Sequence, residues 1–421
     1  MARPSGRWTF LGAIVLVGAL AVSLLVPGAS AAQTTITWLY PGGEQPVSRQ
    51  TWQAQLERFS KVHPEIRVEV IDVPWDLAHD RIVNMVLADD APDLIQMGSR
   101  WIPEFAEMGA LLPLDEYFGT TKGQIYYPAL LKTVTYKGKL YALPRAYSTQ
   151  ALIYRTDLVG APPKTWDELV ATALEIQKEH PGMYGFGIGG ANHVSTLSQY
   201  FTILFSYGGR VFDEAGNVVL DSPEAVAALK EYVDLYRTHK VVPNPLEYNR
   251  EQLPDLFRSG RIAMFISGPW GGRATGLPPE NDQVPYASAK VPAGPAGTAT
   301  EVVSDSTGIW AGTDNLDAAV TFLDFITTEE EQVQRDLIGG LVPQGPDMAA
   351  RPEFKGNPYF ATFVDMAQYG SSQPQPALWE PFQDVIVDMV QSVLLGLRTP
   401  EEAVKNAVTE LRRQNLVPAE L

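Results

Sequence analysis

Aromatic side chains beside turn residues are the part of this sequence best suited to binding a small molecule. The chain has 9 Trp and 17 Tyr. Tyr40 precedes a Pro-Gly-Gly turn at 41–43, Trp270 lies within SGPWGG at 267–272, and Trp379 follows a Pro-Ala-Leu segment. Such rings offer flat apolar faces on which the C–H face of a sugar can stack, while polar neighbours bind the hydroxyls. The alternative interpretation is that each ring packs in the core.

The acidic residues offer little catalytic chemistry. Adjacent carboxylates occur at 89–90, 115–116 and 329–331, and acids at helix ends are usually caps or solvated surface. The glycine run at 184–190 lacks the spacing and strand context of a dinucleotide site, and the sequence contains neither a G-x-S-x-G elbow nor a P-loop. No set of nucleophile and base is evident, although the absence of a motif does not exclude an enzyme.

Composition excludes several classes of protein. The 421 residues carry a formal net charge of −17, with 45% hydrophobic residues, five histidines and no cysteine. An acidic chain lacks the basic surface that general nucleic-acid binding requires. Without cysteine there is no disulfide, thiolate metal site or thiol nucleophile, and no two histidines stand at metal-ligand spacing. We expect no cofactor and no metal.

The first 31 residues have the pattern of a signal peptide. Arg3 and Arg7 precede an almost wholly apolar stretch at 11–26, and Ala-Ser-Ala at 29–31 supplies a cleavage site. The alternative is an uncleaved anchor, although the apolar stretch is short for a membrane span. The protein is expected to cross the inner membrane and to remain periplasmic or at the cell surface. Lipid attachment through cysteine is impossible.

Hydrophobic periodicity predicts an α/β fold. Strand-like segments at 36–39, 66–70 and 93–97 alternate with helical segments, one placing Trp52, Leu56 and Phe59 on one face and the other spanning 77–87. This order is typical of a mainly parallel sheet. Capping boxes at Thr165/Glu168 and Thr399/Glu402 start later helices. Because no clean linker interrupts the chain, two interwoven lobes are favoured over two separate domains.

A series of motifs then resembles one family. They are the segments FSKVHPEIRV at 59–68, APDL at 91–94, GALLPLD at 109–115, GKLYALP at 138–144, IYRTDL at 153–158, PKTWDEL at 163–169, FRSGRIAM at 257–264 and GPW at 268–270. In this order they resemble the sugar-binding subunits of ABC importers, the solute-binding family that includes maltose- and trehalose/maltose-binding proteins. The resemblance extends over residues 35–411.

The resemblance implies the two-lobed periplasmic-binding-protein fold (type II), with three hinge crossings and a ligand cleft between the lobes. The N-terminal lobe is expected to comprise residues 32–146 and 286–328. The C-terminal lobe is expected to comprise residues 147–285 and 329–421. Closure would be driven by contacts that exist fully only in the closed state.

The resemblance also implies a set of ligand-binding residues, carried over position by position. Two departures bear on specificity: Ser99 and Arg100 stand where many members hold an Asp or an Asp-Arg pair, and Gln375 stands where many carry Arg. Trp75 and Trp310 are interpreted as packing residues. The full expected set is Tyr40, Glu44, Ser99, Arg100, Arg145, Tyr147, Tyr200, Trp270, Asp305, Ser306, Gln375 and Trp379.

The function implied is that of a substrate-binding subunit, not an enzyme, that captures a di- or oligosaccharide and delivers it to a permease pair with a cytoplasmic ATPase. The protein is expected to be a monomer. One alternative is a polyol phosphate such as glycerol-3-phosphate, clamped by Arg100 and Arg145, since arginine suits bidentate contact with oxyanions. Another is a secreted glycosidase, which would need two carboxylates about 5–10 Å apart across the cleft.

Overall fold

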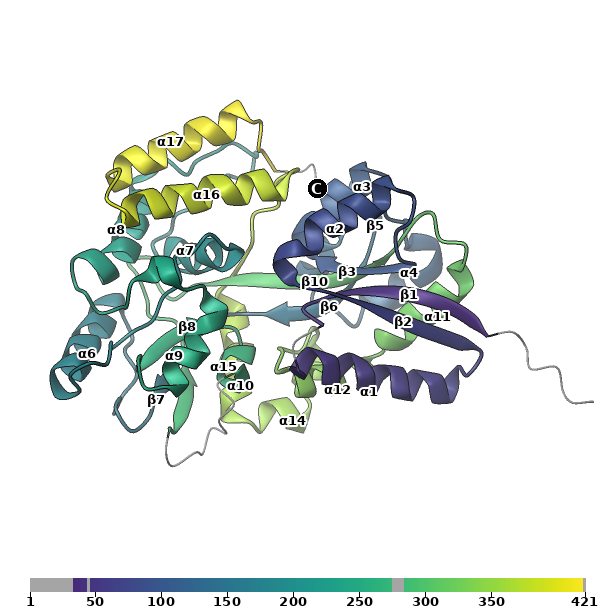
Figure 1. Cartoon of the computed structure of the whole chain (residues 1–421), viewed down its shortest axis with the longest axis horizontal. Coiled ribbons are helices and arrows are strands. Elements are labelled where there is room, and N and C mark those ends of the chain that lie inside the picture. Colours follow the sequence, from purple (N-terminus) through teal and green to yellow (C-terminus); the bar gives the residue numbers. More distant parts are fainter. Residues whose placement is uncertain (1–32, 44–45, 275–283, 419–421) are drawn as a thin grey trace, which may run out of the picture.

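The chain forms two lobes connected by strands that run between them (Figure 1). The computed structural model describes residues 33–43, 46–274 and 284–418. The expected signal peptide at 1–31 lies outside the described residues. Within the described ranges, no helix combines the length and the apolar character needed to span a membrane.

The N-terminal lobe is built on a mixed sheet in the order β11-β10-β3-β1-β2, with β6 also paired to β10. β1 is parallel to β2 and β3, as the alternating strand–helix pattern predicted, whereas β10 runs antiparallel to β3 and β6. The strands are β1 (Thr34–Pro41), β2 (Ile66–Val73), β3 (Leu94–Gly98), β6 (Leu143–Ser148), β10 (Thr300–Ile309) and β11 (Gly370–Ser372).

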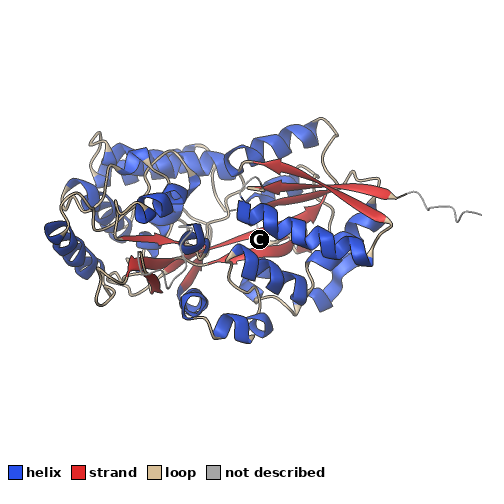
Figure 2. Ribbon diagram, turned by 60° about the horizontal axis from the view of Figure 1, so that its bottom comes forward, coloured by secondary structure: helices blue, strands red, loops and turns tan. Residues whose placement is uncertain are grey.

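Helices flank this sheet (Figure 2). The ring of Phe322 packs against Trp38 of β1 at 5.2 Å and Phe59 at 4.9 Å between ring centroids, which joins a late helix to the start of the chain. The lobe contains α1 (Pro46–Val62), α2 (Trp75–Leu87), the 3-10 turn η1 (Ser99–Trp101), α3 (Ile102–Glu107), α4 (Asp115–Gly123), α5 (Pro128–Thr133), the hairpin β4 (Thr135–Tyr136) and β5 (Lys139–Leu140), α11 (Leu316–Ile326) and α12 (Glu329–Gly339).

The C-terminal lobe has a small antiparallel sheet covered by helices. Its strand order is β8 (Met264–Ser267), β7 (Ala151–Arg155) and β9 (Tyr286–Ala289). The helices are α6 (Trp166–Glu179), α7 (Val194–Ser206), α8 (Pro223–Arg237), η2 (Pro245–Glu247), η3 (Arg250–Gln252), α9 (Leu253–Arg258), α10 (Trp270–Ala274), α15 (Pro358–Met366), η4 (Ala367–Tyr369), α16 (Trp379–Leu394) and α17 (Pro400–Arg413).

The two predicted capping boxes differ in detail. At α17 both reciprocal bonds form between Thr399 and Glu402. At α6 the hydroxyl of Thr165 accepts the backbone N–H of Glu168 at 3.2 Å, but the Glu168 carboxylate accepts from the backbone N–H of Lys164 rather than from that of Thr165. The carboxylate still satisfies a free N–H at the helix start.

Three crossings connect the lobes. The first is the turn from β6 to β7 at 149–150, the second leads from β9 into β10, and the third lies between α12 and α15, where α13 (Pro346–Ala349) and α14 (Pro352–Lys355) stand. The predicted lobe boundaries at 286 and 329 differ from the structure. β9 pairs with β7 in the C-terminal lobe, and α12 packs against α1 in the N-terminal lobe.

Arg145 ties the N-terminal lobe together. Its fully buried guanidinium donates to Gln332 Oε1 at 3.0 Å, to Gln55 Oε1 at 2.9 Å and to the backbone carbonyl of Ile326. Burial lowers the pKa of Arg145 to about 9. These bonds join β6 to α1, α11 and α12. Arg145 is therefore a structural residue, and its inclusion in the expected ligand-binding set is wrong.

Replacing Arg145 should destabilise the folded chain strongly. Arg145→Met would leave three buried acceptors without a donor, and we expect the free energy of unfolding to fall by about 2–4 kcal/mol. Urea denaturation followed by circular dichroism measures this. The control is Arg49→Met, which removes an exposed ion pair with Asp72 and should change stability by less than about 0.5 kcal/mol. Equal effects of the two variants would contradict the role assigned to Arg145.

Candidate functional site

Three tryptophans from both lobes surround one arginine. The guanidinium carbon of Arg100, in η1, lies 4.7 Å from the ring centroid of Trp101 and 5.9 Å from that of Trp75 at the start of α2. It lies 5.2 Å from the ring of Trp379, the first residue of α16. Only 8% of Arg100 is exposed. Of these three rings only that of Trp379 belongs to the expected set, and Trp75 was interpreted as a packing residue. The three rings surround a cation where the lobes meet.

Glycines at the ends of two strands make room for this cluster. A Cβ atom on Gly98, the last residue of β3, would lie 2.5 Å from Nη1 of Arg100 and 2.8 Å from its Cζ. At Gly42, where φ is +72°, a Cβ would lie 2.8 Å from the indole ring of Trp75. Any larger residue at either position would displace the side chain that faces it. The strand ends therefore fix where Arg100 and Trp75 can lie.

The guanidinium of Arg100 has charged neighbours but makes no hydrogen bond to any described residue, and its Nε atom is buried and unpaired. Burial lowers the pKa of Arg100, and the charges of Asp305, Glu380 and Glu301 oppose that effect. A buried donor without an acceptor is unfavourable by about 1–3 kcal/mol. The donors of Arg100 are therefore available for a ligand.

Asp305 stands beside Arg100 because of strand register. On β10 it pairs with Gly98 of β3, immediately before η1. Its half-buried carboxyl group makes no hydrogen bond to the described part of the chain, and burial raises its pKa to about 6, opposed by the charge of Arg100. The buried hydroxyls of Ser99 and Ser306 lie 2.7 Å apart and fasten η1 to β10. The charges of Asp305 and Arg100 thus act on each other, while neither group makes a hydrogen bond to the described residues.

Glu380 belongs to the C-terminal lobe but contacts the N-terminal one. Its Oε1 accepts the indole N–H of Trp101 at 3.1 Å, and its Oε2 accepts from the amide of Gln383 at 3.3 Å. Burial raises the pKa of Glu380, while the charge of Arg100 opposes the rise. The lobes therefore meet through a direct hydrogen bond.

A second aromatic face lies on the C-terminal lobe. Trp270, at the start of α10, is half-buried, and the guanidinium carbon of Arg250 lies 5.2 Å from its ring centroid. Arg250 donates to Ser198 Oγ at 3.1 Å and to Glu251 at 2.9 Å. Its positive charge also contributes to the lowered pKa of Arg100.

Comparison with known proteins places the chain in a family. Residues 43–333 match the profile of the family described as bacterial extracellular solute-binding protein. The chain belongs to this family. Its members are binding proteins rather than enzymes, and their name locates them outside the cell.

Three known proteins are similar along most of this solute-binding protein. Maltose-bound MalE3 of T. maritima is 30% identical, with a TM-score of 0.81 over 90% of this chain and 100% of that one. The GacH receptor of Streptomyces glaucescens, solved unliganded and with acarbose, is 26% identical, with a TM-score of 0.83 over 90% and 98%. The maltotriose-binding protein of Pyrococcus abyssi is 27% identical over 82% of this chain and 76% of that protein.

Some expected binding residues of this solute-binding protein lie away from the lobe interface. Tyr40 is buried in the N-terminal core, its ring 4.8 Å from that of Trp38. Tyr200 is fully buried in the C-terminal lobe, and its hydroxyl donates to the carbonyl of Ala225 at 3.3 Å. Neither ring offers a free face, so we leave both out of the site, together with Arg145.

The other expected residues lie near the crossings or outside the structure. The ring of Tyr147 lies 6.0 Å from that of Tyr127, and the side-chain amide of Gln375 donates to the carbonyl of Thr133 at 3.5 Å. Tyr127 directly precedes α5, and Thr133 is the last residue of α5, so both contacts lie at that helix. Glu44 lies outside the described residues. The residues that the fold gathers are Ser99, Arg100, Asp305, Ser306 and Trp379, with Trp270 linked through Arg250.

Sequence reasoning missed five members of this cluster. Trp101 directly follows Arg100 and Glu380 directly follows Trp379, so adjacency to an expected residue could have found both. Trp75 begins a helix just after β2, a position that suggests a site as well as packing. No sequence signal indicated Arg250 or Glu301, because they come from elements distant in the chain.

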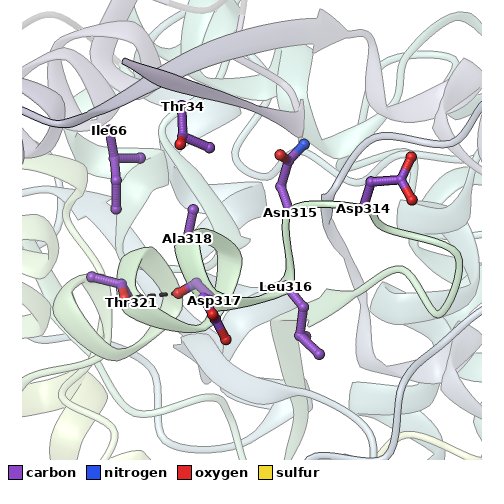
Figure 3. Close-up of a pocket in the computed structure, with 8 residues that line it drawn as sticks. All are labelled: Thr34, Ile66, Asp314, Asn315, Leu316, Asp317, Ala318 and Thr321. Carbon is purple, nitrogen blue, oxygen red and sulfur yellow. Dashed lines mark hydrogen bonds between the residues drawn. The ribbon is translucent and has the colours of Figure 1, made fainter. Parts of the chain in front are cut away.

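A surface pocket lies apart from this cluster (Figure 3). It is lined by residues including Thr34, Ile66, Asn315 and Asp317. Thr34 and Ile66 are the first residues of β1 and β2, so the pocket lies at the amino ends of the parallel strands. Ligands of open α/β sheets bind at the carboxyl ends, where Gly42 and Gly98 stand.

The raised pKa of Asp305 predicts a pH-dependent stability. The ordinary pKa of 3.8 rises to about 6 in the folded protein, so between these values the folded state binds more protons than the unfolded chain. The contribution of Asp305 to the free energy of unfolding is fully present below pH 3.8 and is lost as the pH rises through 6. Asp305→Asn has no carboxyl group at this position, so its free energy of unfolding should not fall in this way as the pH rises.

Thermal unfolding of the ligand-free parent and of Asp305→Asn from pH 4 to pH 7 measures the effect. The variant should gain about 2 kcal/mol relative to the parent across that range. Asp314→Asn, at an exposed position, is the control and should follow the parent. A constant difference between Asp305→Asn and the parent would show that Asp305 is not desolvated.

Proposed function

We propose that this solute-binding protein captures a di- or oligosaccharide between its lobes and delivers it to the permease of an ABC importer. The observation that carries the proposal is the convergence of tryptophans from both lobes on Arg100, whose donors have no hydrogen-bond partner among the described residues. The similar proteins described as binding maltose and maltotriose support the same ligand class.

The chemistry of the cluster suits a neutral polyhydroxyl ligand. Trp270 and Trp379 would stack on the C–H faces of sugar rings. Arg100 would donate to ring or hydroxyl oxygens and Asp305 would accept from hydroxyl groups, so each would gain the hydrogen bonds that it lacks without ligand. Trp379 is fully buried in this structure, with its ring 5.5 Å from that of Phe382 and 5.2 Å from the guanidinium carbon of Arg100. A sugar could therefore stack on it only after the guanidinium shifts toward the ligand.

A clamp of two arginines around a phosphate is not supported. Arg145 is committed to Gln55, Gln332 and Ile326 inside the N-terminal lobe, so it cannot form the expected clamp with Arg100. The carboxylates of Asp305, Glu301 and Glu380 act on Arg100, and an anionic ligand would be repelled by them.

Delivery completes the proposal. A monomer that closes around the sugar would dock on a permease pair, and a cytoplasmic ATPase would drive release and import. The leader at 1–31 would place the protein outside the inner membrane. A binding subunit carries out no reaction, so the ligand would leave chemically unchanged.

A thermal-shift screen of the chain from 32 to 421 tests the function. The panel holds mono-, di- and oligosaccharides, glycerol phosphates, amino acids and short peptides. A ligand that binds only the folded state stabilises it by about 4 kcal/mol at a thousandfold excess over Kd. We expect a shift with one or a few glycosides, each recovered intact after hours with the protein. A shift confined to glycerol phosphates, or hydrolysis of the sugar, would contradict the proposal.

Removal of the half-buried Trp270 ring should weaken binding of the glycoside found in the screen. Trp270→Ala should raise its Kd by about 5- to 150-fold, the range that corresponds to about 1–3 kcal/mol for an aromatic anchor. The matched control is Trp310→Ala, another half-buried tryptophan that lies next to Leu111 in the N-terminal lobe. Calorimetric titration of the folded Trp270→Ala and Trp310→Ala variants with the glycoside measures both affinities. Equal Kd values for the two variants would show that Trp270 does not belong to the site.

A further inference from the structure

A buried carboxylate is connected to the second aromatic face by a chain of hydrogen bonds. Glu301, near the start of β10, is fully buried where α7 packs on that strand (Figure 1). Its Oε2 accepts from the hydroxyl of Ser198 in α7, and this hydroxyl accepts from Nη1 of Arg250 at 3.1 Å. The guanidinium carbon of Arg250 lies 5.2 Å from the ring centroid of Trp270. Four residues from four elements thus form one connected path.

We propose that Glu301 is a positioning residue of the sugar site: through Ser198 it holds the guanidinium of Arg250 over the ring of Trp270, where Arg250 donates to a ligand oxygen. The positioning concerns the protein without ligand, whereas the contact with ligand rests on the proposed function. Neither Glu301 nor Arg250 belongs to the set of binding residues expected from the sequence.

The direction of the hydrogen bonds at Ser198 follows from the groups around it. A hydroxyl group has one donor and two acceptor positions. The guanidinium of Arg250 and the amide nitrogen of Gln150, at 3.1 and 3.0 Å, can only donate to Oγ of Ser198. The single hydroxyl proton is therefore directed at the carboxylate of Glu301. Without an acceptor at Glu301 the hydroxyl could turn, and the lone pair that Arg250 uses would no longer be oriented.

The carboxylate of Glu301 is itself fixed by further donors. Its Oε1 accepts from the side-chain amide of Gln373 at 2.9 Å, and its Oε2 accepts from Nε2 of Gln150 at 3.4 Å. Burial raises the pKa of Glu301, and the bond from Ser198 and the charge of Arg250 oppose the rise. These bonds favour the ionised form, which accepts hydrogen bonds more strongly than a neutral carboxyl group does.

Arg250 is held at both its backbone and its side chain. Its backbone N–H donates to Oγ of Ser195 at 3.1 Å, and Ser195 stands three residues before Ser198, on the same face of α7. Nε and Nη2 of Arg250 donate to Oε1 of Glu251 at 3.2 and 2.9 Å. Three of the five N–H groups of the guanidinium are used in these bonds and in the bond to Ser198. The other two make no hydrogen bond to a residue that the structure describes, and we assign them to the ligand.

The surroundings of Trp270 can be followed without any ligand. In protein labelled with 5-fluorotryptophan, the fluorine resonance of Trp270 is assigned by its loss in Trp270→Phe. Arg250→Met gives the position of this resonance when no cation lies over the ring. The test compares Glu301→Met, which has no carboxylate, with Glu301→Gln, whose amide oxygen can still accept from Ser198. The matched control is Glu331→Met, which replaces another buried glutamate, on α12 of the N-terminal lobe.

We expect Glu301→Met to move the Trp270 resonance toward its position in Arg250→Met. Glu301→Gln should stay closer to the parent, and Glu331→Met should leave the resonance unchanged. In the Arg250→Met background, Glu301→Met should cause no further shift. If Glu301→Met does not fold, Ser198→Ala, which interrupts the same path, decides in its place. A Trp270 resonance at the parent position, or equal shifts with Glu301→Met and Glu301→Gln, would overturn the positioning role.

Calorimetric titration with the glycoside from the screen tests the contact with ligand. Arg250→Met and Glu301→Met should each raise its Kd by about tenfold, the loss expected for one hydrogen bond from a charged group. The double variant should bind no more weakly than Arg250→Met alone. A shifted Trp270 resonance together with an unchanged Kd would contradict the ligand contact. If no glycoside binds, the proposed function fails, while the fluorine resonances still decide whether Glu301 positions Arg250.

Discussion

The pairing of β10 with β3 and β6 in the N-terminal sheet, on a strand that starts at the crossings, is the constraint on which the site depends. Its carboxyl half pairs with β3 and places Asp305 opposite Gly98. Its amino half begins at the crossings, where Glu301 accepts from Gln373 at 2.9 Å. Because a single strand holds both regions, the end of β3 and its Arg100–Trp101 turn must lie next to the hinge. Helix α16, packed on α7 and α17, meets that turn from the other lobe.

Two buried arginines show how the same residue type serves structure and binding. Arg145 is fully buried and donates to three acceptors, so it closes a polar network and is unavailable to solutes. Arg100 is almost as buried but makes no hydrogen bond to the described residues and is held by rings and distant carboxylates. A desolvated group without its bonds is unfavourable in the free protein. The free energy recovered when a ligand supplies those bonds then favours binding.

Much of the fold could be predicted from the sequence, and less of the site. Local patterns were enough to predict the first strands and the start of α17 at Thr399, because strand alternation and helix capping depend on only a few neighbouring residues. Hydrophobic periodicity predicted the α/β class, and the order of the motifs predicted the family. The role of Arg145 could not be predicted, since its partners Gln55 and Gln332 lie 90 and 187 residues away. For the same reason the bond between Glu380 and Trp101, which are 279 positions apart and belong to different lobes, could not be predicted.

The measurement that tests the central claim most directly is a crystal structure of the protein with the glycoside that stabilises it most. The account predicts the sugar between the lobes, stacked on Trp270 or Trp379, with ligand oxygens within hydrogen-bond distance of Arg100. Sugar bound instead in the surface pocket near Thr34, or anywhere that leaves Arg100 without a ligand contact, would contradict the account.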